Sequence, residues 1–402
     1  VVDTNGSGHG ALAGVLNALN ADGRRFGAKI TLSDKTEITD GFYSIDITSS
    51  ANNDTEKMQL GTAIATQVTV NMEEPTSVIY NKEFLLSLGI YIDDTTIEYV
   101  PMGYFKAQKP TVQAGKMTFT ALDRMARLNG NYSSLLSYPC DIADVVKEIQ
   151  TMTGVPIEIP GHMVINKRVE SDDGTTITYC NPFEGYTYKE TLAIIASYYG
   201  RFVTVDRTGK VVFRDYRSRD YQITADRSLE DISVSNEIFN LGYIKCTVDN
   251  DLILKSGNGA TGVTISCFMH TQDTLDNLYD SLKELSYYPA SVSFLGDFRL
   301  DIGDMVTVIT LDGTGIILPI MGMNIEFDGG LTSRIYSYGE TSETAEQQSP
   351  TEKAISRLYQ QLAVVENLIA TKSVTIGQVG TTNLLDDSLT LINDDYTIEI
   401  IE

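Results

Sequence analysis

Alternating apolar and polar positions predict strands in the first quarter of the chain. Alternation with period two is typical of a strand with one buried face, and Gly and Pro separate the alternating segments. These segments are Lys29–Leu32, Phe42–Thr48, Ala65–Val70, Tyr99–Lys106 and Lys116–Thr120. The pattern predicts a first tube-like β domain over residues 26–120.

The period then changes to that of helices. Asp141 can cap a helix that carries Ile142, Val145, Val146 and Ile149 at helical spacing. Further signals are a helix over Ala121–Leu128, a capping box at Thr187–Glu190 before a helix ending at Gly200, and a hairpin of Phe202–Val205 with Val211–Phe213. Residues 121–230 are predicted to form an α+β middle domain.

Strand signals return in residues 231–340, interrupted by a helix over Leu275–Leu285. The predicted strands are Ser233–Ile238, Gly242–Val248, Gly262–Cys267, Ser291–Phe294, Met305–Thr310, Ile316–Ile320 and Arg334–Tyr338. We expect a second tube-like β domain here. The predicted fold class is therefore α+β and β-rich, with two β-barrel domains flanking a mixed α+β domain.

The two ends of the chain have a different character. Residues 1–25 are predicted to be an N-terminal arm with a short helix, and residues 341–350 a polar linker. Residues 351–372 carry an a/d heptad seam, which predicts a short C-terminal coiled-coil helix. The seam residues are Ile355, Leu358, Leu362, Val365 and Ile369. Residues 373–402 contain six acidic and no basic residues, and we expect a trailing strand or an acidic connection to another structure.

Two stretches resemble each other in the order of their features. Leu88-Gly89-Ile90 followed by Pro101-Met102-Gly103 parallels Ile302-Gly303-Asp304 followed by Pro319–Gly322. Chance similarity between β-rich segments is one explanation, and two related β domains are the other. In a trimer, two related domains per chain would give six similar domains around one axis, so a three-fold object could dock on a six-fold ring. We expect the heptad seam to supply the contacts at the trimer axis.

Charge excludes several classes of partner. The 402 residues include 30 Lys and Arg and 54 Asp and Glu, a net charge of −24. Such a chain is unsuited to wrapping nucleic acid or to docking on an anionic membrane, whereas an acidic wall suits DNA that must pass without binding. No apolar run is long enough for a membrane span. The four cysteines form no CxxC pair, and free thiols made in a reducing cytoplasm are expected.

The sequence offers no catalytic, cofactor-binding or metal-ligating constellation. His9, His162 and His270 lack partners at ligand spacing, and the Gly-rich run at 6–10 lacks the Lys-Ser/Thr of a phosphate loop. Asp-rich turns at 93–94, 171–174 and 249–251 could bind Ca²⁺, although Asp and Gly are also ordinary turn residues. We therefore predict a non-enzymatic protein without cofactors. A cell-wall-degrading enzyme with scattered carboxylates, and a glycan- or receptor-binding module using some of the 22 tyrosines, stay as alternatives.

Four segments follow one another in a characteristic order: Ile45–Val70, Leu88-Gly89-Ile90, Pro101–Phe105 and the strand-to-helix passage Thr118–Met125. This order resembles the tail-hub proteins of tailed phages, that is baseplate hubs and the amino-terminal part of tail-associated lysins or prophage tail endopeptidase-like proteins. The resemblance covers about residues 26–340. No peptidase or muramidase domain follows residue 340, so the resemblance does not carry over a cell-wall activity.

The resemblance implies an assembly and a location. It implies a homotrimer at the virion tail tip, assembled in the host cytoplasm, which adapts the six-fold tail tube or distal tail ring to a three-fold tip. Its implied partners are the distal tail protein or tail tube ring, the tape measure protein, and a tip, fibre or receptor-binding protein. Genomic DNA would be a partner only in transit.

Overall fold

The structure is a computed structural model that describes residues 13–21, 23–53, 57–165, 167–170, 177–229, 232–248, 252–310, 313–339, 390–393 and 396–399. The chain divides into two compact units, Val1–Ala345 and Glu346–Glu402. In the second unit the described residues form one antiparallel hairpin of β27 (Thr390–Asn393) and β28 (Tyr396–Glu399). The predicted coiled-coil helix and all five of its seam residues lie outside the described residues.

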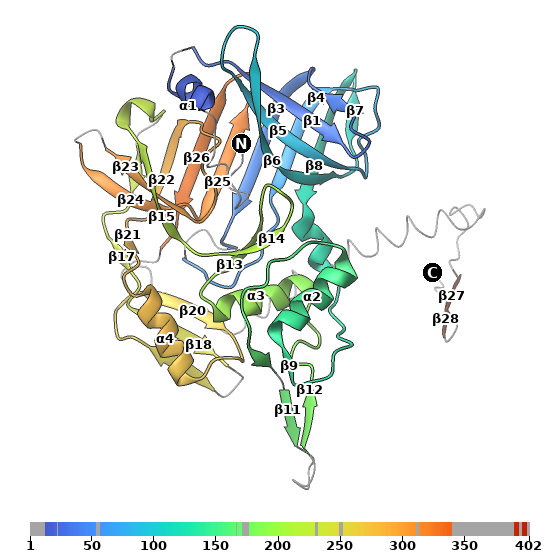
Figure 1. Ribbon diagram of the computed structural model, residues 1–402, viewed down its shortest axis with the longest axis vertical. Coiled ribbons are helices and arrows are strands. Elements are labelled where there is room, and N and C mark those ends of the chain that lie inside the picture. The colour runs from blue at the N-terminus through green and yellow to red at the C-terminus, as the bar shows by residue number, and fades with distance from the viewer. Residues whose placement is uncertain are drawn as a thin grey trace. The chain divides into compact units, whose positions relative to one another are not determined.

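A twelve-stranded antiparallel sheet runs through the first unit (Figure 1). Its order is β16-β22-β26-β25-β3-β4-β8-β6-β5-β1-β2, and β7 pairs with β8. The strands from the first β portion are β1 (Phe26–Leu32), β2 (Glu37–Ile38), β3 (Phe42–Ser50), β4 (Gln67–Glu73), β5 (Glu83–Tyr91), β6 (Ile97–Ala107), β7 (Thr111–Gln113) and β8 (Lys116–Asp123). Those from the second are β16 (Ser233–Val234), β22 (Ala290–Leu295), β25 (Gly322–Phe327) and β26 (Leu331–Ser337).

The two β portions are joined by the pairing of β25 with β3. This antiparallel pairing runs from Gly322 opposite Ser50 to Phe327 opposite Ile45. The expected fold class is confirmed in its β-rich character, but the expected pair of tube-like barrels is not found. Within the described residues the large sheet is open, with edges at β2 and β16, and forms no closed barrel. The predicted domain boundaries stay a prediction.

A second, three-stranded sheet packs on the same hydrophobic core. It consists of β15 (Arg217–Ile223), β23 (Asp304–Ile309) and β24 (Gly315–Pro319), with β15 parallel to β23. Alternation directs Val306, Val308 and Leu318 into the core that the large sheet also covers. Helix α1 (Ala13–Asn20) contributes Val15 and Leu19 to this core.

The two similar stretches differ at their Pro-Met-Gly motifs. Pro101-Met102-Gly103 lies inside β6, where the register with β5 shifts. Pro319–Gly322 instead separates β24 from β25, which belong to different sheets. The same residue types thus accompany a register shift within one strand in the first case. In the second case they accompany the passage of the chain from one sheet to another.

The middle of the chain forms a helical layer with a core of its own. As predicted, the Asp141 side chain caps α2 (Ile142–Thr153), and Thr187 and Glu190 form a capping box on α3 (Tyr188–Tyr198). Its other elements are η2 (Arg124–Asn129), β9 (Cys140–Asp141), β10 (Val164–Ile165), β11 (Lys167–Glu170), β12 (Ile177–Cys180), β13 (Phe202–Val205), β14 (Val211–Arg214) and η3 (Ala225–Arg227). The β13–β14 hairpin is also as predicted.

Two sequence-based boundaries were wrong. Ala121–Leu128 was expected to be helical, but β8 continues to Asp123 because these residues pair with β4 and β6, and a 3₁₀ helix follows. The strand expected over Ser233–Ile238 ends at Val234, because Ser235 accepts a side-chain hydrogen bond from the Glu237 amide in a turn.

A third core lies in a small lobe. Its helix α4 (Gln272–Leu282) packs Leu275 and Leu278 against a small sheet. The strands of the lobe are β17 (Phe239–Asn240), β18 (Tyr243–Thr247), β19 (Ile253–Ser256), β20 (Gly262–Ser266) and β21 (Ser286–Tyr287).

In the described residues, no helix is long and apolar enough to cross a membrane.

Gly61 tests how closely the loop before β4 packs on α3. Its φ is +70°, and a Cβ there would meet the Ser197 Cβ and lie 2.9 Å from the Ala193 carbonyl oxygen. We expect Gly61→Ala to lower the free energy of unfolding by at least about 2 kcal/mol, since backbone strain and overpacking add. Gly313 has φ +84° with no neighbour within 4 Å, so Gly313→Ala is the matched control and should cost only about 1 kcal/mol. Equal losses in urea denaturation would contradict the packing argument.

Candidate functional site

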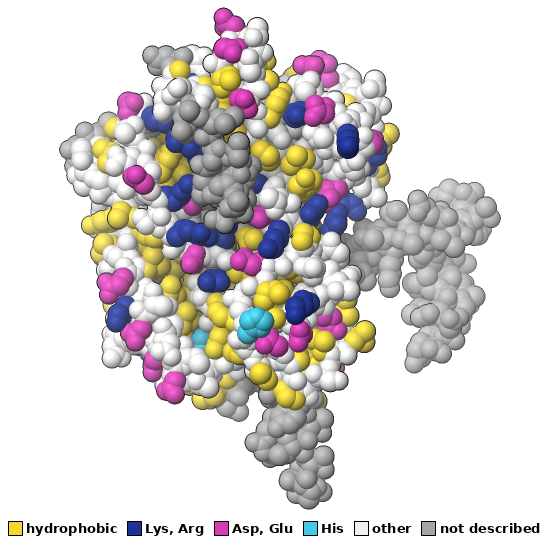
Figure 2. All heavy atoms as spheres, viewed as in Figure 1, with side chains coloured by type: hydrophobic (Ala, Val, Ile, Leu, Met, Phe, Trp, Pro, Cys, Tyr) yellow, Lys and Arg dark blue, Asp and Glu magenta, His cyan; other side chains and the backbone are white. Residues whose placement is uncertain are grey.

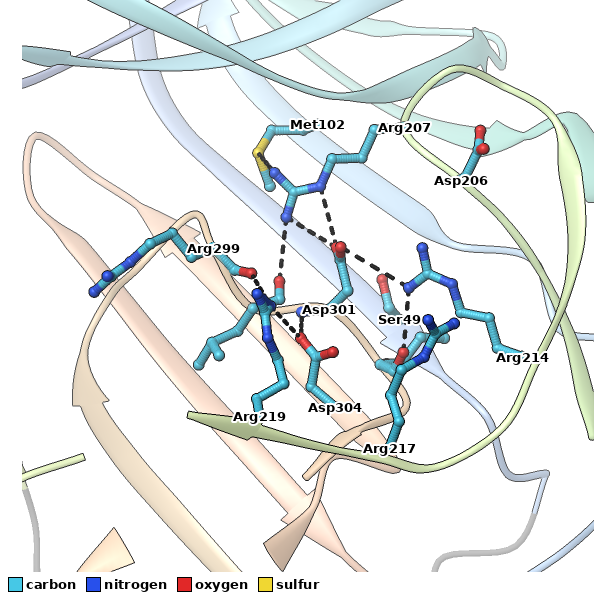
Figure 3. A network of polar contacts seen from close by, with 12 residues as sticks. Ser49, Met102, Asp206, Arg207, Arg214, Arg217, Arg219, Arg299, Asp301 and Asp304 are labelled. Atoms are coloured by element: carbon cyan, nitrogen blue, oxygen red, sulfur yellow. Dashed lines mark hydrogen bonds and ion pairs between the residues drawn. The ribbon is translucent and has the colours of Figure 1, made fainter. Parts of the chain in front are cut away.

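A cluster of charged side chains lies where the β13–β14 hairpin meets both β portions (Figure 3). The side chains come from β6, from the hairpin turn, from β14 and β15, and from the start of β23 and the loop before it. We call this cluster the junction, and its central residues are Arg207, Arg214, Arg219, Asp301 and Asp304. In Figure 2, Lys and Arg side chains gather across the middle of the face in view, over the region of β13–β15.

Arg207 is the centre of the junction. Its side chain is only 5% exposed. Its Nε and Nη2 donate to Asp301 Oδ1 at 3.1 and 2.9 Å, and Nη2 also donates to the Leu300 carbonyl at 3.2 Å. Nη1 donates to the Pro101 carbonyl of β6 at 3.4 Å. One buried guanidinium therefore joins the middle of the chain to β6 in the first β portion and to the loop before β23 in the second.

A second ion pair supports the first. Arg219 of β15 donates to Asp304 Oδ2 at 3.2 Å, and the same oxygen accepts from the Asp301 backbone amide at 3.0 Å. Arg214 Nη1 donates to the Ile302 carbonyl and lies 3.9 Å from Asp301 Oδ2. Burial raises the pKa of Asp304 to about 6, although the charge of Arg219 opposes this shift.

The hairpin turn is held from the other side by Arg124. Its Nη1 donates to the Gly209 carbonyl at 3.0 Å, while Nε and Nη2 form a two-bond pair with Glu83 at 2.9 and 3.0 Å. Hydrogen bonds from Arg124 and the nearby charge of Arg127 lower the pKa of Glu83 despite its burial. The turn is thus fixed between two arginine–carboxylate pairs.

Asp123 is another deeply buried carboxyl group in this region, at 5% exposure. It accepts hydrogen bonds from the Thr66 and Met125 backbone amides, both at 2.9 Å, so it links the start of β4 to η2. Burial raises the pKa of Asp123 to about 7. This group takes up a proton on folding, because an unfolded Asp titrates near 4.

The hollow at the junction is small. It is lined by polar groups that include Ser49, Thr66 and Asp123, and its volume of about 50 Å³ has room for a few water molecules. The charged groups around it are bonded to one another and to backbone carbonyls. Chemically, this arrangement is suited to fixing three parts of the chain against each other.

The structure does not bring the sequence-identified candidates for chemistry together. His162 is an exposed side chain 3.4 Å from Asp141, and His270 is buried, stacks on Tyr198 and contacts Thr274 through Nδ1. Within the described residues no group of three His, Cys, Asp or Glu side chains could hold a metal ion.

The Asp-rich turn at Asp93 has a structural explanation. Its carboxylate accepts from the amides of Thr95 and Thr96 at 2.8 and 2.7 Å, and these bonds lower the pKa of Asp93 to about 2. His9 and the turns at 171–174 and 249–251 lie outside the described residues.

The junction residues were not identified from the sequence as a site. Arg207 and Asp301 are 94 positions apart, so no local motif contains both. The one available signal is that six of the 30 basic residues fall within residues 201–219 of an acidic chain. These six are Arg201, Arg207, Lys210, Arg214, Arg217 and Arg219.

Comparison with known proteins gives a fold similarity. The chain is similar to the tail protein from Neisseria meningitidis MC58, with a TM-score of 0.52 at 12% identity over 77% of this chain and 95% of that one. Weaker similarities are to the 43 kDa tail protein of prophage MuSo2 from Shewanella oneidensis (TM-score 0.48, 14% identity, 78% and 97% coverage) and to prophage tail protein gp18 from Listeria monocytogenes EGD-e (0.46, 12%, 85% and 99%). No family model and no curated protein sequence matches the chain.

Arg207→Met tests the junction. This change leaves Asp301 buried without its main partner, and removing one member of a buried ion pair costs about 3–5 kcal/mol. Arg217 is 58% exposed and belongs to the same basic stretch, so Arg217→Met is the matched control and should change stability by less than about 0.5 kcal/mol. Chemical denaturation measures both, and equal effects would show that the Arg207 pair does not hold the three parts together.

Asp123→Asn tests the buried carboxyl group through pH. Because the folded-state pKa is raised to about 7, the contribution of Asp123 to stability is fully present below about pH 4 and is lost as pH rises toward 7. The neutral variant lacks this titration. The stability difference between Asp123→Asn and wild type should therefore move in favour of the variant between pH 4 and 7. A difference that is constant over this range in urea melts would contradict a raised pKa.

Proposed function

We propose that this chain is a structural tail-tip or baseplate hub of a phage or phage-like particle, acting as a homotrimer that adapts a six-fold tail tube or distal tail ring to a three-fold tip. The observation that carries the proposal is the fold similarity to the Neisseria tail protein, which extends over 95% of that protein. In this proposal the chain works by holding shape and not by catalysing a reaction.

The architecture of the described part supports a role as a rigid structural component. One sheet continues from the first β portion to the second, and four charged groups form two ion pairs between distant segments at the junction. Long antiparallel pairing and buried ion pairs both oppose relative movement of the parts they join, because such movement would break several hydrogen bonds at once. A protein placed between two rings needs this stiffness.

The net charge of −24 supports a place along the path of DNA. A wall of carboxylates repels phosphate, so DNA can pass without being retained. Distal tail ring, tape measure protein and tip or fibre are the proposed neighbours, and the virion tail tip is the proposed location.

Electron microscopy and mass measurement of the purified full-length chain test the proposal. We expect three copies around a channel, and rings that bind the distal tail or tube protein of the same particle. A chain that stays monomeric at micromolar concentration and binds neither protein would overturn the hub. Binding of the isolated chain to peptidoglycan fragments with hydrolysis would favour an enzyme instead.

Leu358→Asp tests the predicted trimer axis. A charge at a seam position opposes packing of the helices, and we expect association at least about tenfold weaker. Gln360 falls outside the a and d positions, so Gln360→Asp adds the same charge as a matched control and should leave the mass unchanged. Sedimentation measurements in which both variants keep the wild-type mass would exclude this seam as the axis.

A further inference from the structure

Two small sheets of the first unit, β15-β23-β24 and β19-β18-β20, have an edge strand at each end among the described strands. Of these four edge strands, β24 and β19 expose a large apolar side chain to solvent. A free strand edge presents unpaired N–H and C=O groups and is a template for pairing with another chain. Each of the two edges carries a half-exposed isoleucine.

In β24 the outward-facing backbone groups include those of Ile317, the central residue of the strand. The Ile320 amide donates to the Asp304 carbonyl at 2.8 Å, and the Thr310 amide donates to the Thr314 carbonyl at 2.9 Å. Hydrogen-bonded and outward-facing residues alternate along an antiparallel strand, so these bonds direct the N–H and C=O of Ile317 away from β23. Its side chain is 51% exposed, although the neighbouring residues on either side are buried.

In β19 the corresponding residue is Ile253. The Val248 amide donates to the Leu252 carbonyl at 2.9 Å, and the same alternation directs the backbone of Ile253 outward. Its side chain is 54% exposed, and that of Leu252 is 46% exposed. Further along, Gln272 of α4 donates to the Lys255 carbonyl at 3.1 Å, so the free part of this edge is centred on Ile253.

The edges of the large sheet are protected in the ways that natural proteins use. Strands β2 and β16 are each two residues long, and Glu37 of β2 pairs with Lys29 at 2.8 Å. Short, charged edges resist pairing with other chains. Against this background, the five residues of β24 with a central isoleucine form an edge built for a partner.

We infer that copies of this chain associate head to tail by pairing β24 of one copy with β19 of the next, with Ile317 and Ile253 at the centre of the contact. The inference rests on the proposed function in one respect, the assembly of identical copies. Because two different edges meet, the contact is heterologous, and repetition around an axis can close it into a ring. Backbone hydrogen bonds between the two edges fix the relative orientation of neighbouring copies. The charge repulsion between acidic copies does not fix it.

Cysteine cross-linking of the full-length chain tests the contact. Facing residues in paired strands bring their Cβ atoms within about 4.5–5.5 Å, which a disulfide can bridge after small adjustment. Under oxidised glutathione, the Ile317→Cys/Ile253→Cys double variant should form disulfide-linked multimers. The two single variants are controls and should not. Linking in Ile317→Cys alone would mean that β24 pairs with β24, and would overturn the inference.

A lysine at the edge provides a second measurement. Ile317→Lys should weaken self-association at least about tenfold without changing the folded monomer, because the side chain is already half in solvent. Leu229 is 47% exposed on another element, so Leu229→Lys is the matched control and should associate as wild type does. If the trimer persists in Ile317→Lys and the double cysteine variant forms no cross-link, the β24–β19 contact is overturned and the proposed hub is not. A wild-type chain that never associates overturns both.

Discussion

The burial of one guanidinium group constrains the whole first unit. Arg207 is nearly inaccessible to solvent and its positive charge is stable there only while Asp301, the Leu300 carbonyl and the Pro101 carbonyl all surround it. These partners come from both β portions, and the arginine comes from the segment between them. The three parts therefore reach their final positions together, because any one of them alone leaves a charge or a carbonyl without its partner.

The buried carboxyl groups of the first unit differ in pKa according to their partners. Asp297 is one case, because its fully buried carboxylate keeps a lowered pKa through contacts with Arg299 and with the Tyr221 hydroxyl. Asp123 has backbone amides as its hydrogen-bond donors, and burial raises its pKa. The difference follows from the partner: a guanidinium stabilises the charged form far more than two amides do.

The sequence predicted correctly those elements whose stabilising contacts join residues close together in the chain. The Asp141 cap, the Thr187 capping box and the β13–β14 hairpin all depend on residues a few positions apart, and each was predicted. The helix expected at Ala121 failed because pairing with β4, some fifty residues earlier, outweighs helical spacing there. Strand β15 was missed because its polar, exposed sequence becomes a strand only through parallel pairing with β23.

The junction shows the same limit for a site. Nothing near Arg207 in sequence indicates Asp301, and the cluster of basic residues in 201–219 could have suggested a charged surface but not a buried ion pair. Likewise, the open sheet replaced two expected barrels because strand pattern fixes which face of a strand is buried and not which strand lies beside it. The pairing of β3 with β25 has no counterpart in local pattern.

That pairing has a consequence for biosynthesis. About 270 residues separate the end of β3 from the start of β25, and ribosomes add roughly 5–20 residues per second. One edge of β3, which contains Ile45 and Ile47, therefore stays unpaired for tens of seconds on every nascent chain. Several ribosomes on one message would hold such strands near each other, so chaperone binding or spacing of the nascent chains becomes part of how this fold is obtained in good yield.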